Sequence, residues 1–247
     1  MSEAHKAAIV TAAGRGLGLA AARELHARGY RLALLSPSGA AEGAARELGG
    51  IGRTGSVTEP DDLAALVDAT MAAFGRIDAV VSSTGSAPAG DILEIADADW
   101  HAGADMVLLN VVRIARLVTP IMRRNGGGAF VNISTFAAFE PHPAYPVSSC
   151  MRAALAGYTK LFADRYAAEG IRMNNVLPGM IDNYPEDPAV RARIPSGRYG
   201  RVEGSPRRSR FLPPTTPATS PARTSASTEG SREACRRRPP RAADMPA

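Results

Sequence analysis

The stretch Thr-Ala-Ala-Gly-Arg-Gly-Leu-Gly at residues 11–18 decides how the rest of the chain is interpreted. It follows an apolar run that begins at Ala7, and it opens a helical pattern that continues to about Arg28. Closely spaced glycines at such a strand-to-helix turn let the backbone approach a pyrophosphate, whose charge is met by the amino-terminal end of the helix. A glycine-rich turn without any ligand has the same appearance, so the loop alone leaves both interpretations open.

Outward from this loop, the chain up to about residue 203 alternates short apolar runs with amphipathic stretches. The runs RLALL, IDAVVSS and AFVNIS have the length and composition of buried strands. The stretches DDLAALVDATMAAF and AALAGYTKLFADRYAAEG carry apolar residues at the three- and four-residue spacing of helices that pack on a sheet. Alternating strands and helices predict βαβ units and a parallel sheet.

Further motifs follow in order along residues 7 to about 203. Residues 11–18 resemble the T-G-x-x-x-G-x-G loop of the classical short-chain dehydrogenase/reductase family, with Ala12 at the first glycine. Residues 75–85 resemble its fourth strand and N-N-A-G turn, the run GGGAFVNIST resembles its fifth strand, and residues 174–182 resemble its N-x-V-x-P-G loop. The resemblance implies an α/β fold with a Rossmann-like doubly wound parallel sheet. It also implies an NAD(P)(H)-dependent oxidoreductase that acts on a carbonyl/alcohol substrate.

The positions that carry the family's chemistry differ from its pattern. Counting without gaps from the flanking motifs places Thr135 at the serine position, Ser148 at the tyrosine position and Arg152 at the lysine position. The helix asparagine position falls on Val107, and Asn110 lies one turn further along. Thr135 keeps a hydroxyl donor and Arg152 keeps a cation, but an aliphatic alcohol such as Ser148 is a poor general acid near neutral pH.

Tyr145 is the candidate substitute for the missing tyrosine. It lies three residues before Ser148 and is followed by Pro146, which suits the first turn of a helix. We therefore take Thr135, Tyr145, Ser148 and Arg152 as the catalytic candidates. The other interpretation of Tyr145 is an aromatic residue that only packs at the start of the helix.

The residues that choose between NAD and NADP are also altered. The acid that selects NAD in the family falls at Ser36, and the acid that contacts adenine falls at Ser56, before Val57. Arg15 resembles the basic residue of members that prefer NADP, although a solvated loop charge would look the same. We therefore expect NADP or NAD as cofactor, with a weak preference for NADP. The resemblance assigns cofactor contacts to Thr11, Gly14, Arg15, Gly16, Leu17, Gly18, Ser36, Ser56, Val57, Ser82, Thr84, Gly85, Arg152, Pro178 and Gly179.

Composition excludes several other classes of protein. Cys150 and Cys235 form no disulfide framework or zinc motif, the four histidines show no metal-ligand spacing, and no G-x-S-x-G elbow is present. No signal-type start or run of about 18 apolar residues occurs, so we expect a cytoplasmic protein without membrane or nucleic-acid partners. The net charge of +5 comes from residues 204–247, which hold nine Arg and three acids, whereas residues 1–203 carry −1.

The sequence changes character after Glu203. Residues 204–247 contain no Ile or Val and eight of the 19 prolines, so we predict a disordered tail after a dinucleotide-binding domain at residues 1–203. Codons can be chosen for Thr219 to Gly230 that, when the reading frame is shifted by one base, encode Y-I-T-G-Q-N-I-R-V-D-G-G. This shifted sequence resembles the family's last strand. We therefore hypothesise a frameshift just after Glu203, and we expect the last strand and helix of the fold to be missing.

Two functions stay open at this point. The first is a short-chain dehydrogenase/reductase with an atypical active site, and the second is a nucleotide-binding pseudoenzyme or an inactive, frame-shifted gene product. Ser148, Val107 and the tail favour the second, whereas the loop at residues 11–18 and Pro178–Gly179 favour cofactor binding under both. The resemblance also implies a homo-oligomer, but the family's contacts between subunits use the region that this tail replaces.

Overall fold

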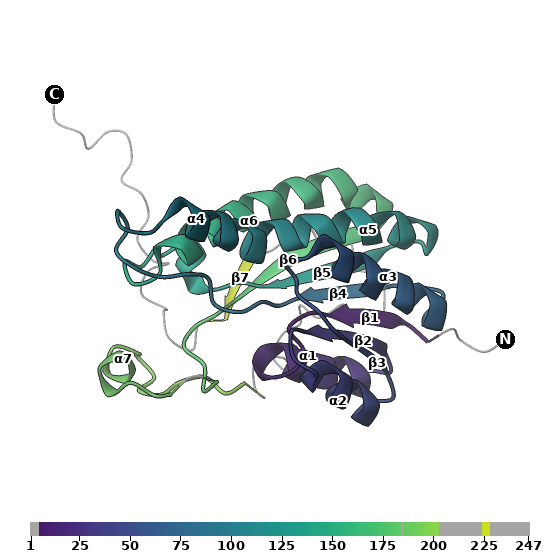
Figure 1. Ribbon diagram of the computed structural model, residues 1–247, viewed down its shortest axis with the longest axis horizontal. Coiled ribbons are helices and arrows are strands. Elements are labelled where there is room, and N and C mark those ends of the chain that lie inside the picture. Colours follow the sequence, from purple (N-terminus) through teal and green to yellow (C-terminus); the bar gives the residue numbers. More distant parts are fainter. Residues whose placement is uncertain (1–4, 184, 203–223, 228–247) are drawn as a thin grey trace.

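The computed structural model describes residues 5–183, 185–202 and 224–227, and it contains one sheet of parallel strands (Figure 1). The strand order is β3-β2-β1-β4-β5-β6-β7. The strands β2 and β3 therefore lie on one side of β1, and the strands β4 to β7 lie on the other side, so the strand order reverses between β1 and β4. The strands are β1 (Ala7–Val10), β2 (Arg31–Ser36), β3 (Ile51–Thr54), β4 (Ala79–Ser82), β5 (Gly128–Ile133), β6 (Ile171–Pro178) and β7 (Thr224–Ser227). The predicted doubly wound parallel sheet is confirmed.

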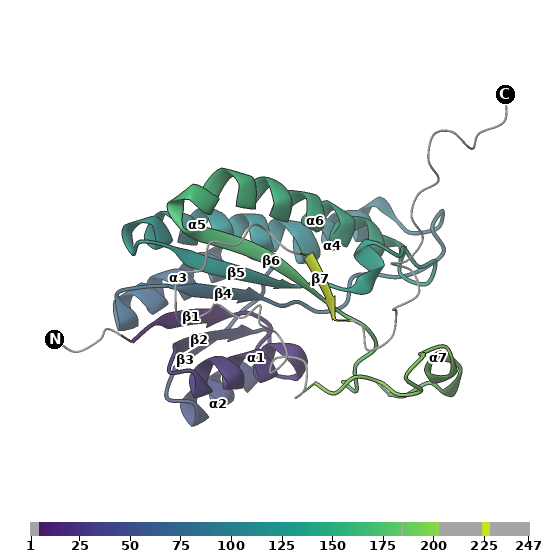
Figure 2. The same cartoon turned by 180° about the vertical axis from the view of Figure 1, so that it is seen from behind.

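Helices cover both faces of the sheet (Figures 1 and 2). One face carries α1 (Gly16–Ala27) and α2 (Ala40–Glu47), and the other carries α3 (Pro60–Phe74), α4 (Asp97–Ala104), α5 (Asn110–Arg124) and α6 (Pro146–Tyr166). A π-helical turn (Asp105–Leu109) joins α4 to α5, and short 3-10 turns occur at Phe136–Ala138 and Ala167–Glu169. The short helix α7 (Pro188–Ala192) follows β6.

The apolar core lies in two layers, one on each face of the sheet. The layer under α3, α5 and α6 is centred on Phe130, Ile114 and Leu66, and the layer under α1 and α2 on Leu25 and Leu34. Strands buried on both faces need continuous apolar runs, which is why RLALL and AVV read as strands in the sequence. This rigid sheet fixes where the loops at its edges begin.

The edge strand β7 corrects one expectation from the sequence. The last strand was predicted to be missing, yet Thr224–Ser227 pairs in parallel with β6, from Asn175↔Thr224 to Pro178↔Ser227. Figure 2 shows this strand beside β6. Ladder hydrogen bonds join backbone groups, so a segment without an apolar pattern can still make them. The disordered tail and the missing helix predicted after Glu203 concern residues 203–223 and 228–247, which lie outside the described residues.

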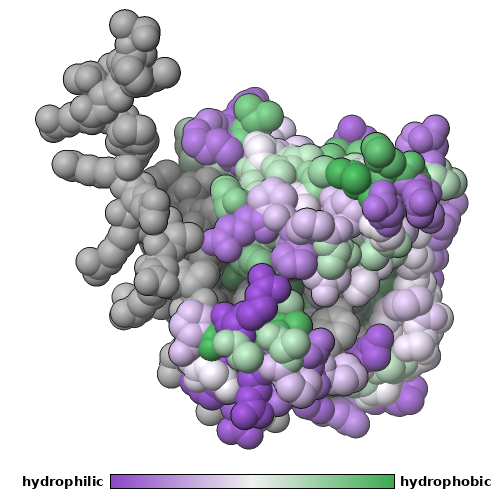
Figure 3. Space-filling model, turned by 90° about the vertical axis from the view of Figure 1, so that its left-hand side faces the viewer, coloured by the Kyte–Doolittle hydropathy of each residue, from purple (hydrophilic) through white to green (hydrophobic). Residues whose placement is uncertain are grey.

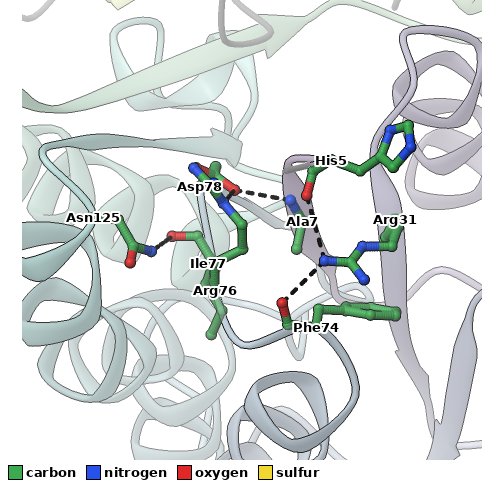
Figure 4. Close-up of polar contacts among 8 residues, drawn as sticks. All are labelled: His5, Ala7, Arg31, Phe74, Arg76, Ile77, Asp78 and Asn125. Carbon is green, nitrogen blue, oxygen red and sulfur yellow. Dashed lines mark hydrogen bonds and ion pairs between the residues drawn. The ribbon is translucent and has the colours of Figure 1, made fainter. Parts of the chain in front are cut away.

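Polar contacts fasten the strands at the amino-terminal edge of the sheet (Figure 4). The Asp78 carboxylate accepts the backbone N–H of Ala7 at 2.8 Å and two N–H groups of Arg76, at 2.8 and 2.6 Å. Arg31 donates to the carbonyl oxygen of Phe74 at 2.9 Å and lies over its ring. Nearby, burial raises the pKa of Tyr30, and the Asp78 carboxylate raises it further. Asp78 therefore ties β1 to the segment before β4, and Arg31 ties β2 to the end of α3, so both side chains serve the structure at this edge.

The carboxyl-terminal edge of the sheet, onto which Figure 3 looks, is where the glycine-rich loop and the catalytic candidates begin. In open α/β sheets, ligands bind at this edge, beside the point where the strand order reverses. Within the part of the chain that the structure describes, no helix is long and apolar enough to cross a bilayer. The same residues contain no group of three or more His, Cys, Asp or Glu side chains that could hold a metal ion.

Candidate functional site

The loop after β1 is tied to the neighbouring strand β4. The Thr11 hydroxyl donates to the carbonyl oxygen of Ser83 at 2.7 Å and accepts the N–H of the same residue at 2.9 Å. The backbone N–H of Thr11 donates to the carbonyl oxygen of Val81 at 3.0 Å. Thr11 therefore joins the two strands between which the order of the sheet reverses, and this fixes the start of the glycine-rich loop.

The glycines of this loop allow backbone to approach backbone. A Cβ on Gly18 would lie 2.9 Å from the carbonyl carbon of Ala12 and 3.1 Å from the carbonyl oxygen of Thr11, and a Cβ on Gly14 would lie 2.9 Å from that of Ala40. Helix α1 begins at Gly16, after an exposed Arg15, with no side-chain cap and no acidic residue in its first turn. Its first N–H groups are therefore available to an anion.

Ala12 adopts a left-handed backbone conformation, with a φ of 46°. This is the position at which the family motif has glycine, and the conformation costs an L-residue about 1 kcal/mol that glycine does not lose. We expect Ala12→Gly to raise the free energy of unfolding by up to about 1 kcal/mol, measured by urea denaturation. Ala13→Gly is the matched control, because Ala13 is fully buried and has no positive φ. Ala13→Gly should destabilise the protein, because it removes a buried methyl group. Equal changes in the free energy of unfolding for the two variants would therefore contradict the strain assigned to Ala12.

Buried hydroxyl groups without partners gather where β4 and β5 end. The hydroxyl oxygens of Ser82, Thr84 and Ser134 are buried and have no hydrogen-bond partner in the protein. Buried polar groups are nearly always satisfied, so unpaired hydroxyls at a ligand-binding edge indicate a polar ligand. Together with the glycine loop and the uncapped α1, they fit a nicotinamide dinucleotide, whose pyrophosphate the loop would hold. Ser134 was not among the sequence candidates, although its place directly after a strand was a usable signal.

The two serines at the acid positions are engaged by the protein. The buried Ser36 hydroxyl donates to the carbonyl oxygen of Ser38 at 2.6 Å and accepts the N–H of Ala41 at 3.1 Å, next to Gly14. The Ser56 backbone N–H donates to the Asp62 carboxylate at 2.7 Å. Neither serine supplies a carboxylate, so the site has no acid at either of these positions to accept a ribose or adenine group.

The remaining cofactor candidates lie along the same edge. Leu17 is half-buried in the first turn of α1, Val57 packs partly buried against the core, and Gly85 is exposed in the segment after β4. Pro178 is the buried last residue of β6, and Gly179 follows it, exposed. The structure brings Thr11, the glycines of the loop and Ser36 together.

Arg152 and Ser148 form a polar pair on α6. The guanidinium Nε–H of Arg152 donates to the Ser148 hydroxyl oxygen at 3.1 Å, and Nη1–H donates to the carbonyl oxygen of Ile133 at 2.9 Å. Ile133 is the last residue of β5, and the Arg152 side chain is buried, with a relative exposure of 7%. The cation is therefore fixed at the carboxyl-terminal edge of the sheet, and it polarises the Ser148 hydroxyl by donating to its oxygen.

The other catalytic candidates lie around this pair. Thr135 begins the turn Phe136–Ala138, which contacts α6, and its hydroxyl oxygen accepts the N–H of Ala137 at 3.1 Å. Tyr145 stands directly before α6, with its ring near that of His142, centroids 5.7 Å apart, and it is 46% exposed. Helix α6 begins at Pro146, as predicted.

The helix positions of the family's proton relay carry no free polar group. Val107 is fully buried within the π-helical turn. The Asn110 side-chain amide donates to the carbonyl oxygen of Met106 in that turn, so it serves the local backbone. The π-helical turn itself was not predicted, because an ungapped count of residues contains no signal for it.

Comparisons with known proteins agree with the geometry. The sequence model of a family described as enoyl-(acyl carrier protein) reductase matches residues 11–203. The 3-oxoacyl-[acyl-carrier-protein] reductase of Synechocystis sp. is 31% identical over 217 residues, which are 83% of this chain and 87% of that protein. The cis-4-hydroxycyclohexanecarboxylate dehydrogenase of Sinomonas cyclohexanicum is 33% identical over 213 residues, 81% of this chain and 86% of that protein.

A solved structure shares the fold across most of its length. L-sorbose reductase from Gluconobacter frateurii, complexed with NADPH and L-sorbose, superposes with a TM-score of 0.76 at 26% identity, covering 81% of this chain and 86% of that one. Three observations therefore point to the same family: the parallel sheet, the glycine-rich loop tied by Thr11, and the sequence match over residues 11–203. The chain belongs to the short-chain dehydrogenase/reductase family of NAD(P)-dependent oxidoreductases.

Proposed function

We propose that the protein transfers a hydride between NAD(P)(H) and the carbon of a ketone or secondary alcohol, with Tyr145 as the proton donor. The observation that carries this proposal is the buried Arg152 guanidinium, which bonds both Ser148 and the end of β5 at the ligand-binding edge. A fixed cation and an oriented hydroxyl at one place are suited to stabilising negative charge on a substrate oxygen. When bound, NADPH or NADH supplies the hydride.

The protein's own groups act on the substrate oxygen. As the carbonyl carbon gains a hydride, its oxygen gains negative charge, which the hydroxyls of Thr135 and Ser148 would stabilise by donating hydrogen bonds. The proton then passes from the Tyr145 hydroxyl to this oxygen, since a phenol is a stronger acid than the Ser148 alcohol. Tyr145 is 46% exposed, so water can return its proton directly, and a relay through position 107 is not required.

We expect NADP(H) to be preferred over NAD(H). Ser36 presents no carboxylate to repel a 2′-phosphate, and its hydroxyl is already engaged with Ser38 and Ala41. The exposed Arg15 at the start of α1 adds a positive charge to the same loop. Titrations of NADPH and NADH, followed by nicotinamide fluorescence, compare the two affinities directly.

Tyr145→Phe tests the proton donor. This variant should lower kcat with a panel of carbonyl substrates at least about 100-fold, because general acid catalysis contributes about that much, and NADPH affinity should not change. Tyr166→Phe, near the far end of α6, is the control and should keep full turnover. Unchanged turnover in Tyr145→Phe would remove Tyr145 from this role.

A nucleotide-binding pseudoenzyme is the second candidate. It is favoured by the buried Val107 and by the partner of the Ser148 hydroxyl, which is the Arg152 cation and so cannot accept a proton. NADPH binding without turnover of any carbonyl in the panel would support this candidate, and absence of NADPH binding would contradict both.

A further inference from the structure

Large apolar side chains are exposed on two loops beside the candidate site. The segment between β4 and α4 carries Ile92 and Leu93, which are 59% and 92% exposed, and the segment between β5 and α6 carries Phe139 and Tyr145, 61% and 46% exposed. The other large apolar side chains that are exposed in the described part of the chain are Leu109, Leu117 and Leu161, which lie on the helices between and after these loops.

Both loops leave the sheet at the same edge. Strands β4 and β5 are parallel neighbours, with Ser82 opposite Asn132, so the loops that follow them start side by side. The second loop contains Thr135 at its beginning and ends at Tyr145, one turn before Ser148. The exposed apolar side chains therefore belong to two segments that begin side by side at this edge, and the second segment connects β5 to the helix that carries Ser148 and Arg152.

Exposed apolar clusters on a protein surface commonly mark binding sites. An apolar ligand body that covers Leu93 and Phe139 removes their surface from water, and this favours binding. A polyhydroxylated ligand in the same place would lose water from hydroxyl groups that these side chains cannot pair. The composition of the loops therefore favours an apolar ligand over a polyhydroxylated one.

We propose that the substrate is a ketone or secondary alcohol whose body is an apolar ring or chain, contacted by Leu93 and Phe139. This inference rests on the proposed function for the reacting oxygen, but the contact with the apolar body can be measured without turnover. Both side chains are specificity-determining residues in this proposal, and neither takes part in the chemical step.

Ligand-observed NMR on the full chain saturated with NADP⁺ tests the contact. Cyclohexanone or 2-octanone should show saturation transfer from the protein, whereas L-sorbose at the same concentration should not. Leu93→Ala combined with Phe139→Ala should weaken binding of the apolar ketone at least about tenfold. Leu161→Ala is the matched control, because Leu161 is 71% exposed on α6 away from both loops, and it should bind like the parent protein.

Steady-state kinetics supply the second readout. The double variant should raise KM for the apolar ketone about tenfold with kcat nearly unchanged, since it alters binding and leaves the reacting groups in place. Binding of L-sorbose as tight as that of the ketones, failure of both ketones to bind, or identical behaviour of the double variant and Leu161→Ala would overturn the inference. Ketone binding that depends on Leu93 and Phe139 without any turnover would support the apolar contact and contradict the proposed function.

Discussion

Restoring one base after the codon for Glu203 is expected to raise the midpoint temperature of unfolding by about 10 °C or more. The change would replace the present residues 219–230 by Y-I-T-G-Q-N-I-R-V-D-G-G, which carries several large apolar side chains that the present segment lacks. Burying each such side chain contributes about 1.5–3 kcal/mol, and in a domain of this size each kcal/mol shifts the midpoint by about 2–4 °C.

The position of β7 supports this expectation. The strand occupies Thr224–Ser227, and these four codons re-read as N-I-R-V. In a strand, alternate residues share a face, so the restored Ile and Val would lie on the same face, opposite Val176 and Pro178 in the register of β6. The present Thr-Ser-Ala-Ser offers the same backbone pairing without two large apolar side chains.

DNA sequencing around codon 204 and thermal unfolding of the two proteins check this prediction. The matched control receives two inserted bases at the same place, which gives the third reading frame and should not raise the midpoint. The hypothesis is wrong if the one-base insertion yields no Y-I-T-G and D-G-G in frame, or if the resulting protein unfolds at or below the midpoint of the parent chain.

Some of the site could be predicted because it depends on local sequence. The loop at residues 11–18 follows a continuous apolar strand and opens a helix, so its place at the edge of a parallel sheet follows from the order of the elements. The pairing of Ser148 with Arg152 follows from their four-residue spacing on one helix. These relations need only the periodicity of strands and helices.

Other features depend on contacts that spacing does not contain. The bond from Arg152 to the Ile133 carbonyl oxygen requires α6 to pack at the end of β5, and the unpaired hydroxyl of Ser134 is recognised only once its surroundings are buried. Strand β7 was not predicted because Thr224–Ser227 has no apolar pattern, and its pairing depends on the open edge of β6. In each case a tertiary neighbour decides the outcome.

Gly18→Ala is expected to weaken NADPH binding at least about tenfold, which corresponds to about 1.4 kcal/mol, and to lower the free energy of unfolding by about 1–3 kcal/mol. The added methyl group would meet the carbonyl groups of Ala12 and Thr11, which are backbone atoms and cannot rotate away. Thr11 is held by Val81 and Ser83, so the strain has to be relieved by moving the phosphate loop.

Gly43→Ala is the matched control for this substitution. Gly43 lies within α2, and a Cβ there would meet no atom within 4 Å, so the change should only add helix propensity. It is expected to stabilise the protein by up to about 1 kcal/mol and to leave NADPH affinity unchanged. Fluorescence titration with NADPH and urea denaturation measure both quantities for both variants. If Gly18→Ala binds NADPH as tightly as Gly43→Ala does, the close approach of α1 to the loop does not shape the cofactor site. In that case the loop would have accommodated the added methyl group without moving.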